Sequence, residues 1–141
     1  MKKVTGIGGI FFKCKDPEKI KAWYRNHLGI DAGKYGFNFQ WNEDPKNNSN
    51  GCTSWTPFSQ NSDYFNPSQK DLMINYRVEN LEELVSELKS QGISMLDEIE
   101  TYPYGKFVHL LDPEDNKIEL WEPNDAEYDK MGKQMGAATT K

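Results

Sequence analysis

Residues 105–123 read Gly-Lys-Phe-Val-His-Leu-Leu-Asp-Pro-Glu-Asp-Asn-Lys-Ile-Glu-Leu-Trp-Glu-Pro. The pattern predicts a strand over 106–111, a tight turn over 112–116 and a second strand over 117–122. Proline presets the second turn position, and Asp and Asn favour turn geometry. Side chains alternate between the faces of a strand. One face would therefore carry His109, Glu119 and Trp121, and the other, apolar face would consist of Val108, Leu110, Ile118 and Leu120.

Size and composition predict one small globular domain. The chain has 141 residues, of which 36% are hydrophobic and 13% aromatic. A net charge of −5 argues against nucleic-acid binding, which needs a basic surface. Cys14 and Cys52 lack metal-ligand spacing and are expected to be buried, reduced thiols. There is no membrane-spanning apolar run and no signal peptide pattern, so no membrane partner and a cytoplasmic location are expected.

The first half of the chain predicts a strand, a helix and further strands. A strand is expected over 5–15, and Asp16-Pro17-Glu18 then supplies a helix N-cap, an N1 proline and a first-turn acid. Gly29 is the expected C-cap. Strands are expected over 35–42 and 52–58, with a polar connector over 59–70.

The second half repeats the order of the first. A strand over 72–78 leads to Asn80, a second N-cap placed 64 residues after Asp16, and the helix ends at Gly92. A short strand over 99–102 and the hairpin follow. The chain thus divides into two β-α-β-β-β modules, about 5–58 and 71–123. A tail over 124–141 is expected to form one helical turn near 126–131 and then fray.

The hairpin also carries a family resemblance. An Asp-Pro-x-x-Asn turn, then Ile-Glu-Leu before Trp-Glu-Pro, resembles the closing hairpin of the glyoxalase/bleomycin-resistance/dioxygenase group, the vicinal oxygen chelate superfamily. The resemblance covers about residues 5–123. It implies an α+β fold in which two tandem βαβββ modules form a curved mixed sheet around a cleft. In metal-dependent members, the glutamate that matches Glu119 is a metal ligand.

The other ligand positions implied by this resemblance hold unsuitable residues. The family pattern places one ligand at Gly9, and the internal repeat places a second at Met73. A fourth position falls near Trp55, where Ser54 and Thr56 are the polar neighbours. Glycine has no side-chain donor, and a thioether binds hard or borderline ions poorly. The sequence therefore predicts no cofactor and no tightly bound metal, with a divalent ion on Glu119 as the alternative.

Strand alternation predicts which side chains line the cleft. The catalytic candidates are Glu119 and His109. The ligand-binding candidates are Phe11, Lys13, Trp41, Trp55, Met73, Asn75, Arg77, Tyr104 and Trp121. An aromatic pocket with a few polar groups is typical of a small-molecule site. If Lys13 and Arg77 both face inward, an anionic substrate becomes reasonable, whereas a register shift of one residue would make both ordinary solvated charges.

Two functions follow from this set. The first is metal-independent binding of a small organic molecule, as in the bleomycin-binding members of the superfamily. The alternative is a lyase or isomerase, related to lactoylglutathione lyase, in which Glu119 acts as acid or base with His109 or a weakly held metal. The same pair could also form only a structural hydrogen bond. Members of the superfamily usually dimerise, and Trp23 or Tyr24 could serve a homodimer interface.

Overall fold

The computed structural model describes residues 3–41, 51–128 and 138–139. Two long helices, a helical turn at 125–128 and one eight-stranded sheet are the regular elements of this part of the chain. The elements in chain order are β1 (Val4–Cys14), α1 (Pro17–Leu28), β2 (Phe37–Gln40), β3 (Cys52–Ser59), β4 (Leu72–Val78), α2 (Leu81–Ser90), β5 (Glu100–Tyr102), β6 (Gly105–Leu111), β7 (Lys117–Pro123) and β8 (Ala138–Thr139).

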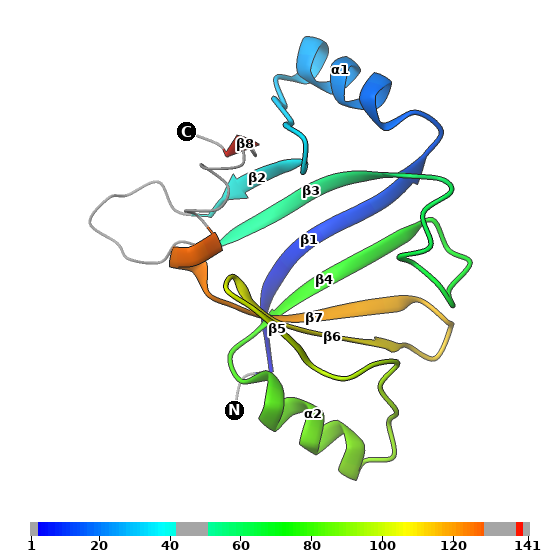
Figure 1. Ribbon diagram of the computed structural model, residues 1–141, viewed down its shortest axis with the longest axis vertical. Coiled ribbons are helices and arrows are strands. Elements are labelled where there is room, and N and C mark those ends of the chain that lie inside the picture. The colour runs from blue at the N-terminus through cyan, green and yellow to red at the C-terminus, as the bar shows by residue number, and fades with distance from the viewer. Residues whose placement is uncertain (1–2, 42–50, 129–137, 140–141) are drawn as a thin grey trace.

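The sheet has the strand order β5-β6-β7-β4-β1-β3-β2-β8. The first strands of the two halves, β1 and β4, pair antiparallel at its centre, and each has a parallel neighbour, β3 and β7. The sheet curves, and α1 and α2 lie at its opposite ends (Figure 1). The expected α+β fold with a curved mixed sheet is therefore confirmed.

Two details differ from the sequence expectation. Within the described residues, α1 is followed by two strands, whereas α2 is followed by three. The tail was expected to fray, but Ala138 and Thr139 pair with β2 at the edge of the sheet. An open strand edge offers unpaired backbone groups, so a distant segment can add to it.

Both helices begin with the predicted cap. The Asp16 carboxylate accepts a hydrogen bond from the Lys19 backbone N–H, and Asn80 Oδ1 accepts one from Glu83 N–H, both at 3.1 Å. These side chains satisfy donors that a helix start leaves free. Gly29 ends α1 with a φ of 73°, a left-handed conformation that glycine adopts without strain.

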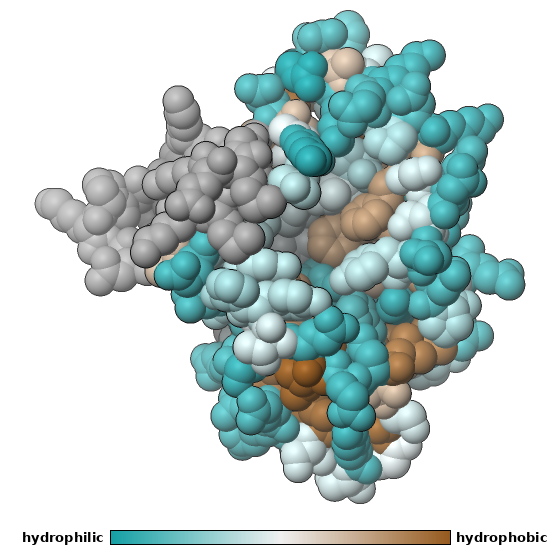
Figure 2. All heavy atoms as spheres, viewed as in Figure 1, coloured by the Kyte–Doolittle hydropathy of each residue, from teal (hydrophilic) through white to brown (hydrophobic). Residues whose placement is uncertain are grey.

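The apolar core lies between α2 and the second half of the sheet. It contains Val78, Leu81, Leu84, Val85, Val108, Leu110 and Leu120. By contrast, Lys21 is the one buried residue of α1. The space-filling view agrees, since apolar residues show around α2 while α1 presents mostly hydrophilic ones (Figure 2). No helix in the described part of the chain is long and apolar enough to span a bilayer.

The hairpin forms as predicted. The Asp112 carboxylate accepts hydrogen bonds from the backbone N–H groups of Glu114 and Asn116, and Asp115 takes a φ of 65°. This turn pairs His109 with Glu119 and Val108 with Leu120. One face of β6 and β7 therefore joins the apolar core, while the other presents the imidazole and the carboxylate.

Candidate functional site

A row of polar residues crosses the sheet at one level. Strand pairing joins neighbours along this row from β2 through β3, β1, β4 and β7 to β6. Paired residues point to the same face of a sheet. The row consists of Asn38, Ser54, Gly9, Asn75, Glu119 and His109. All six are buried, and five of them, all but Gly9, carry polar side chains, whose burial is unusual and requires hydrogen bonding.

Glycine leaves the middle of this row open. The pairing of β1 with β4 shifts between Ile7 and Gly9, so a bulge places Gly8 beside the row. A Cβ atom on Gly8 would collide with the side-chain oxygen of Asn75 and crowd Trp121. Residues larger than glycine at this position would therefore fill the centre of the sheet face.

Three side chains donate to the Glu119 carboxylate. Asn75 Nδ2 donates to Oε1 at 2.6 Å, and the Tyr64 hydroxyl donates to Oε2. His109 Nε2 also lies 2.8 Å from Oε2. Glu119 is 2% exposed, so these bonds compensate for the removal of the carboxylate from water.

Asp97 holds the opposite side of the imidazole. Its carboxylate lies 2.7 Å from His109 Nδ1 and also accepts the His109 backbone N–H at 2.8 Å. Burial lowers the pKa of His109, but the hydrogen bonds and charges of Glu119 and Asp97 outweigh it and raise that pKa above its ordinary value. Burial and the nearby Glu119 charge raise the pKa of Tyr64, which keeps its phenol neutral.

This raised pKa predicts how stability changes with pH. Because folded His109 binds its proton more tightly than the unfolded chain does, its stabilisation is complete below about pH 6.5 and is lost as pH rises through the folded pKa. We expect the free energy of unfolding, measured in urea, to fall between pH 6 and 8.5 by at most about 1.4 kcal/mol per pH unit. His109→Gln should flatten this slope, and His27→Gln, on the exposed side of α1, should retain it. A slope unchanged in His109→Gln would contradict the assignment.

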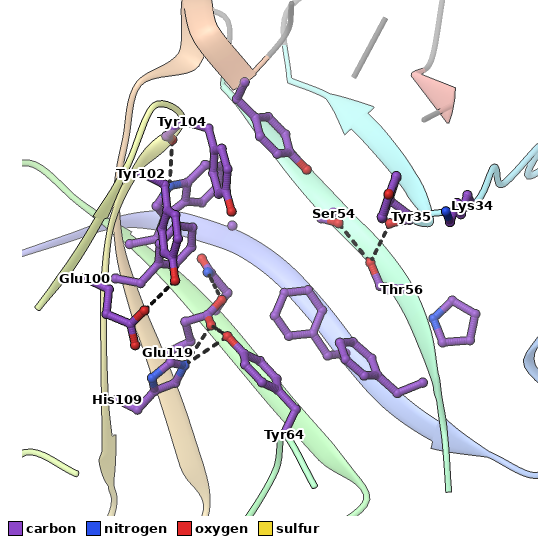
Figure 3. A pocket seen from close by; sticks show the side chains of 18 of the residues that line it. Lys34, Tyr35, Ser54, Thr56, Tyr64, Glu100, Tyr102, Tyr104, His109 and Glu119 are labelled. Carbon is purple, nitrogen blue, oxygen red and sulfur yellow. Dashed lines mark hydrogen bonds and ion pairs between the residues drawn. The ribbon is translucent and has the colours of Figure 1, made fainter. Parts of the chain in front are cut away.

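Four residues of the row line a cleft with a volume of about 710 Å³, namely Ser54, Asn75, Glu119 and His109. Glu119, His109 and Tyr64 lie together on one side with Glu100, Tyr102 and Tyr104, while Lys34, Tyr35, Ser54 and Thr56 lie on the other (Figure 3). Aromatic rings make much of its lining. They are Phe11, Tyr35, Phe58, Tyr64, Tyr102, Tyr104, Phe107, Trp121 and Tyr128.

Six of the candidates chosen from sequence line this cleft. They are Phe11, Asn75, Tyr104, His109, Glu119 and Trp121. Trp121 is 3% exposed, stacks on Phe107 and donates its indole N–H to the Tyr104 carbonyl. The second half of the sheet contributes most of the set, because its strands alternate regularly and the short hairpin fixes their register.

Three other candidates lie outside the cleft. Ser54 and Thr56 face the cleft, so Trp55 between them points to the opposite face of β3. There it packs on Tyr24 of α1. Trp41 is 45% exposed and donates its indole N–H to Thr53. Lys13 lies with its ammonium group over the ring of Phe65.

Arg77 and Met73 are also absent from the lining. Arg77 is buried between the rings of Trp41 and Trp121 and pairs with Asp125 at 2.5 Å. Met73 is 1% exposed and pairs with Phe11, two residues from the polar row. The residue of β4 beside Glu119 is therefore Asn75, and the placement of Met73 at the second ligand position is corrected.

Two important lining residues come from segments for which the sequence predicted no role in the site. Tyr64 belongs to the connector between the halves, and Tyr128 follows the hairpin in a helical stretch at 125–128. The Tyr128 hydroxyl donates to Asn38 Oδ1 at the far end of the row. The available signal in each case was an aromatic residue within a polar run.

The residues around the Glu119 carboxylate do not fit a metal site. Both of its oxygens already accept hydrogen bonds from the protein, and the neighbouring row positions hold glycine, serine and an asparagine that donates to Glu119. Metal ligands need free oxygen or nitrogen lone pairs directed at one point. Across residues 3–41, 51–128 and 138–139, no group of three or more His, Cys, Asp or Glu side chains is arranged to hold a metal ion.

Family membership agrees with this architecture. Residues 6–120 match the family model of the Glyoxalase/Bleomycin resistance protein/Dioxygenase superfamily. The chain therefore belongs to this superfamily, as the closing hairpin predicted. No curated protein matches the sequence.

Similar solved structures include several methylmalonyl-CoA epimerases. The enzyme from Mycobacterium tuberculosis is 20% identical, with a TM-score of 0.57 over 87% of this chain and 91% of that chain. A Streptomyces coelicolor epimerase variant in complex with 2-nitronate-propionyl-CoA is 14% identical, with a TM-score of 0.59 over 86% and 99%. A protein described as NAD-dependent benzaldehyde dehydrogenase from Legionella pneumophila is 15% identical, with a TM-score of 0.50 over 82% and 98%. At these identities the similarity establishes the shared fold.

Proposed function

We propose that this protein binds a small organic molecule in the cleft and does so without a resident metal. The observation that carries the proposal is the buried polar row beneath an aromatic-walled cleft, in which Glu119 is held by Asn75, His109 and Tyr64. A concave, mostly apolar site with a few fixed polar groups is the usual form of a ligand pocket. Complexes of structurally similar epimerases with coenzyme A compounds support small-molecule binding on this fold.

A second candidate is a metal-independent enzyme that transfers protons. The chain from Asp97 through His109 to Glu119 and Tyr64 favours it, because a carboxylate fixes the imidazole and the imidazole reaches the more exposed phenol. In an enzyme, His109→Gln would remove turnover while leaving the aromatic walls intact. In a binding protein, the same change would leave most of the affinity.

Two kinds of partner are proposed for this protein. A small molecule is the proposed partner, in a cytoplasmic protein. A homodimer is also proposed, through the exposed Trp23 of α1, which is 51% exposed and stacks on Tyr24 and His27.

Binding in the cleft can be mapped by ¹⁵N–¹H nuclear magnetic resonance with a set of phenyl-containing small molecules. We expect concentration-dependent shifts of the backbone signals of Gly8, Tyr64 and Tyr104, all of which line the cleft. Signals of Leu84 and Leu88 in α2 serve as controls and should stay in place. Shifts confined to residues outside the cleft would contradict the proposed site.

A further inference from the structure

One tyrosine of the cleft wall joins the two halves of the sheet. The ring of Tyr128 packs on Trp121 and Tyr104, which belong to the second half, with ring centroids 5.1 and 6.4 Å apart. Its hydroxyl donates to Asn38 Oδ1 at 2.9 Å, and Asn38 lies on β2 in the first half. Tyr128 also lines the cleft. Its side chain therefore reaches from one half of the sheet to the other.

The Tyr128 hydroxyl covers the last residue of the polar row. Asn38 is 4% exposed and shares the sheet face of Ser54, its partner on β3. Ser54 lines the cleft, whereas Asn38 is not among the described lining residues. Because Tyr128 both lines the cleft and bonds to Asn38, it stands between them. Within the described part of the chain, the cleft therefore ends at Tyr128 in the direction of β2.

Several contacts hold the segment that carries this tyrosine. The Asn124 backbone N–H donates to the Tyr104 carbonyl at 3.1 Å, and the Tyr128 N–H donates to the Asn124 carbonyl at 2.9 Å. Asp125 pairs with Arg77, which is 5% exposed. Separation of this pair would leave a buried guanidinium without its counterion, which is costly. Tyr128 is thus part of a fixed wall of the cleft.

We infer that Tyr128 closes the β2 end of the cleft and so limits the length of the ligand. This inference rests on the proposed function and names the residue that sets its specificity. A ligand that extended past the ring would have to displace it and would leave the buried Asn38 oxygen without its donor. A side chain that obstructs the longer of two related ligands discriminates between them.

Removal of the ring should lengthen the site. In Tyr128→Ala, the space above Asn38 and Ser54 becomes part of the cleft. The probes are two neutral alcohols with a shared phenyl group, 2-phenylethanol and 6-phenylhexan-1-ol. We expect isothermal titration calorimetry to show that Tyr128→Ala raises the affinity ratio of the long to the short alcohol by at least about tenfold, because burial of about two further methylenes contributes that factor.

A tyrosine elsewhere on the cleft wall provides the matched control. Tyr102 also lines the cleft, but its hydroxyl bonds to Glu100 and it is 41% exposed. Tyr102→Ala should keep the affinity ratio of the unaltered protein. An equal rise of this ratio in both variants would overturn the specific role of Tyr128. If Tyr128→Ala does not fold, Tyr128→Leu, whose side chain is too short to span the same gap, decides with the same expected direction.

The side-chain amide signal of Asn38 in ¹⁵N–¹H nuclear magnetic resonance locates the effect. In the unaltered protein, 6-phenylhexan-1-ol should shift the signals of Gly8 and Tyr104 and leave the Asn38 amide in place. In Tyr128→Ala it should shift the Asn38 amide as well. Shifts of Gly8 and Tyr104 together with an unchanged affinity ratio and an unmoved Asn38 amide in Tyr128→Ala would overturn the inference and leave the proposed function standing. No shift of any cleft signal with either alcohol would count against both.

Discussion

Glu119→Ala is expected to lower the free energy of unfolding by about 3 kcal/mol at pH 7. The carboxylate is buried and accepts hydrogen bonds from Asn75, Tyr64 and His109. Its removal leaves three donors without an acceptor, one of them on an imidazole whose pKa is raised by the same carboxylate. Breaking one side of a buried charged network is costly, because the other side remains buried and unpaired.

The matched control is Glu82→Ala. Glu82 pairs with Lys106 at 2.6 Å, but it is exposed at the surface. Exposed ion pairs contribute little because water and salt screen them, so this variant should unfold at nearly the same urea concentration as the unaltered protein. If the two substitutions lowered the free energy of unfolding equally, the hydrogen bonds to Glu119 would not stabilise the protein in solution.

Trp121→Ala is expected to cost about 3 kcal/mol of stability and most of the ligand affinity. The indole is 3% exposed, stacks on Phe107, contacts Tyr128 and supports the guanidinium of Arg77. Its loss removes a large buried surface and one wall of the cleft together. For the tightest-binding phenyl probe, we expect affinity to fall by at least about tenfold.

Trp23→Ala provides the comparison for this second prediction. Trp23 lies on α1, is 51% exposed and does not line the cleft. We expect its replacement to leave probe affinity unchanged and to reduce stability much less than Trp121→Ala does. Retained affinity in Trp121→Ala, measured under conditions where the variant is folded, would remove Trp121 from the binding site.

The local features of the fold could be read from the sequence. The Asp112 turn, the caps at Asp16 and Asn80 and the alternation along β6 and β7 all depend on residues close together in the chain. Such signals survive without knowledge of distant contacts. The approach of His109 to Glu119 followed from the hairpin alone.

The rest of the site depends on distant contacts. Tyr64 reaches Glu119 across 55 positions of sequence, and Tyr128 reaches Asn38 across 90. No periodicity within one strand predicts such contacts. The repeat placed the second ligand position at Met73 from its distance to Asn80, but the pairing of β4 with β7 puts Asn75 beside Glu119, and this pairing joins strands about 44 positions apart.

Arg77 was predicted to line the cleft, and this prediction is wrong because neighbouring side chains cover it. Arg77 shares the strand face of Asn75, but the rings of Trp41 and Trp121 enclose it and Asp125 neutralises it. Parity along a strand predicts the face of the sheet. It does not predict which neighbours lie above that face.

We propose that protein donors, and not a metal ion, hold Glu119 at the floor of a ligand-binding cleft. The most direct test is elemental analysis of the purified protein, followed by melting in the presence of added divalent ions. The predicted result is far less than one metal ion per chain and no rise in melting temperature with any ion. One ion per chain that raises the melting temperature of the unaltered protein, but not that of Glu119→Ala, would contradict the account.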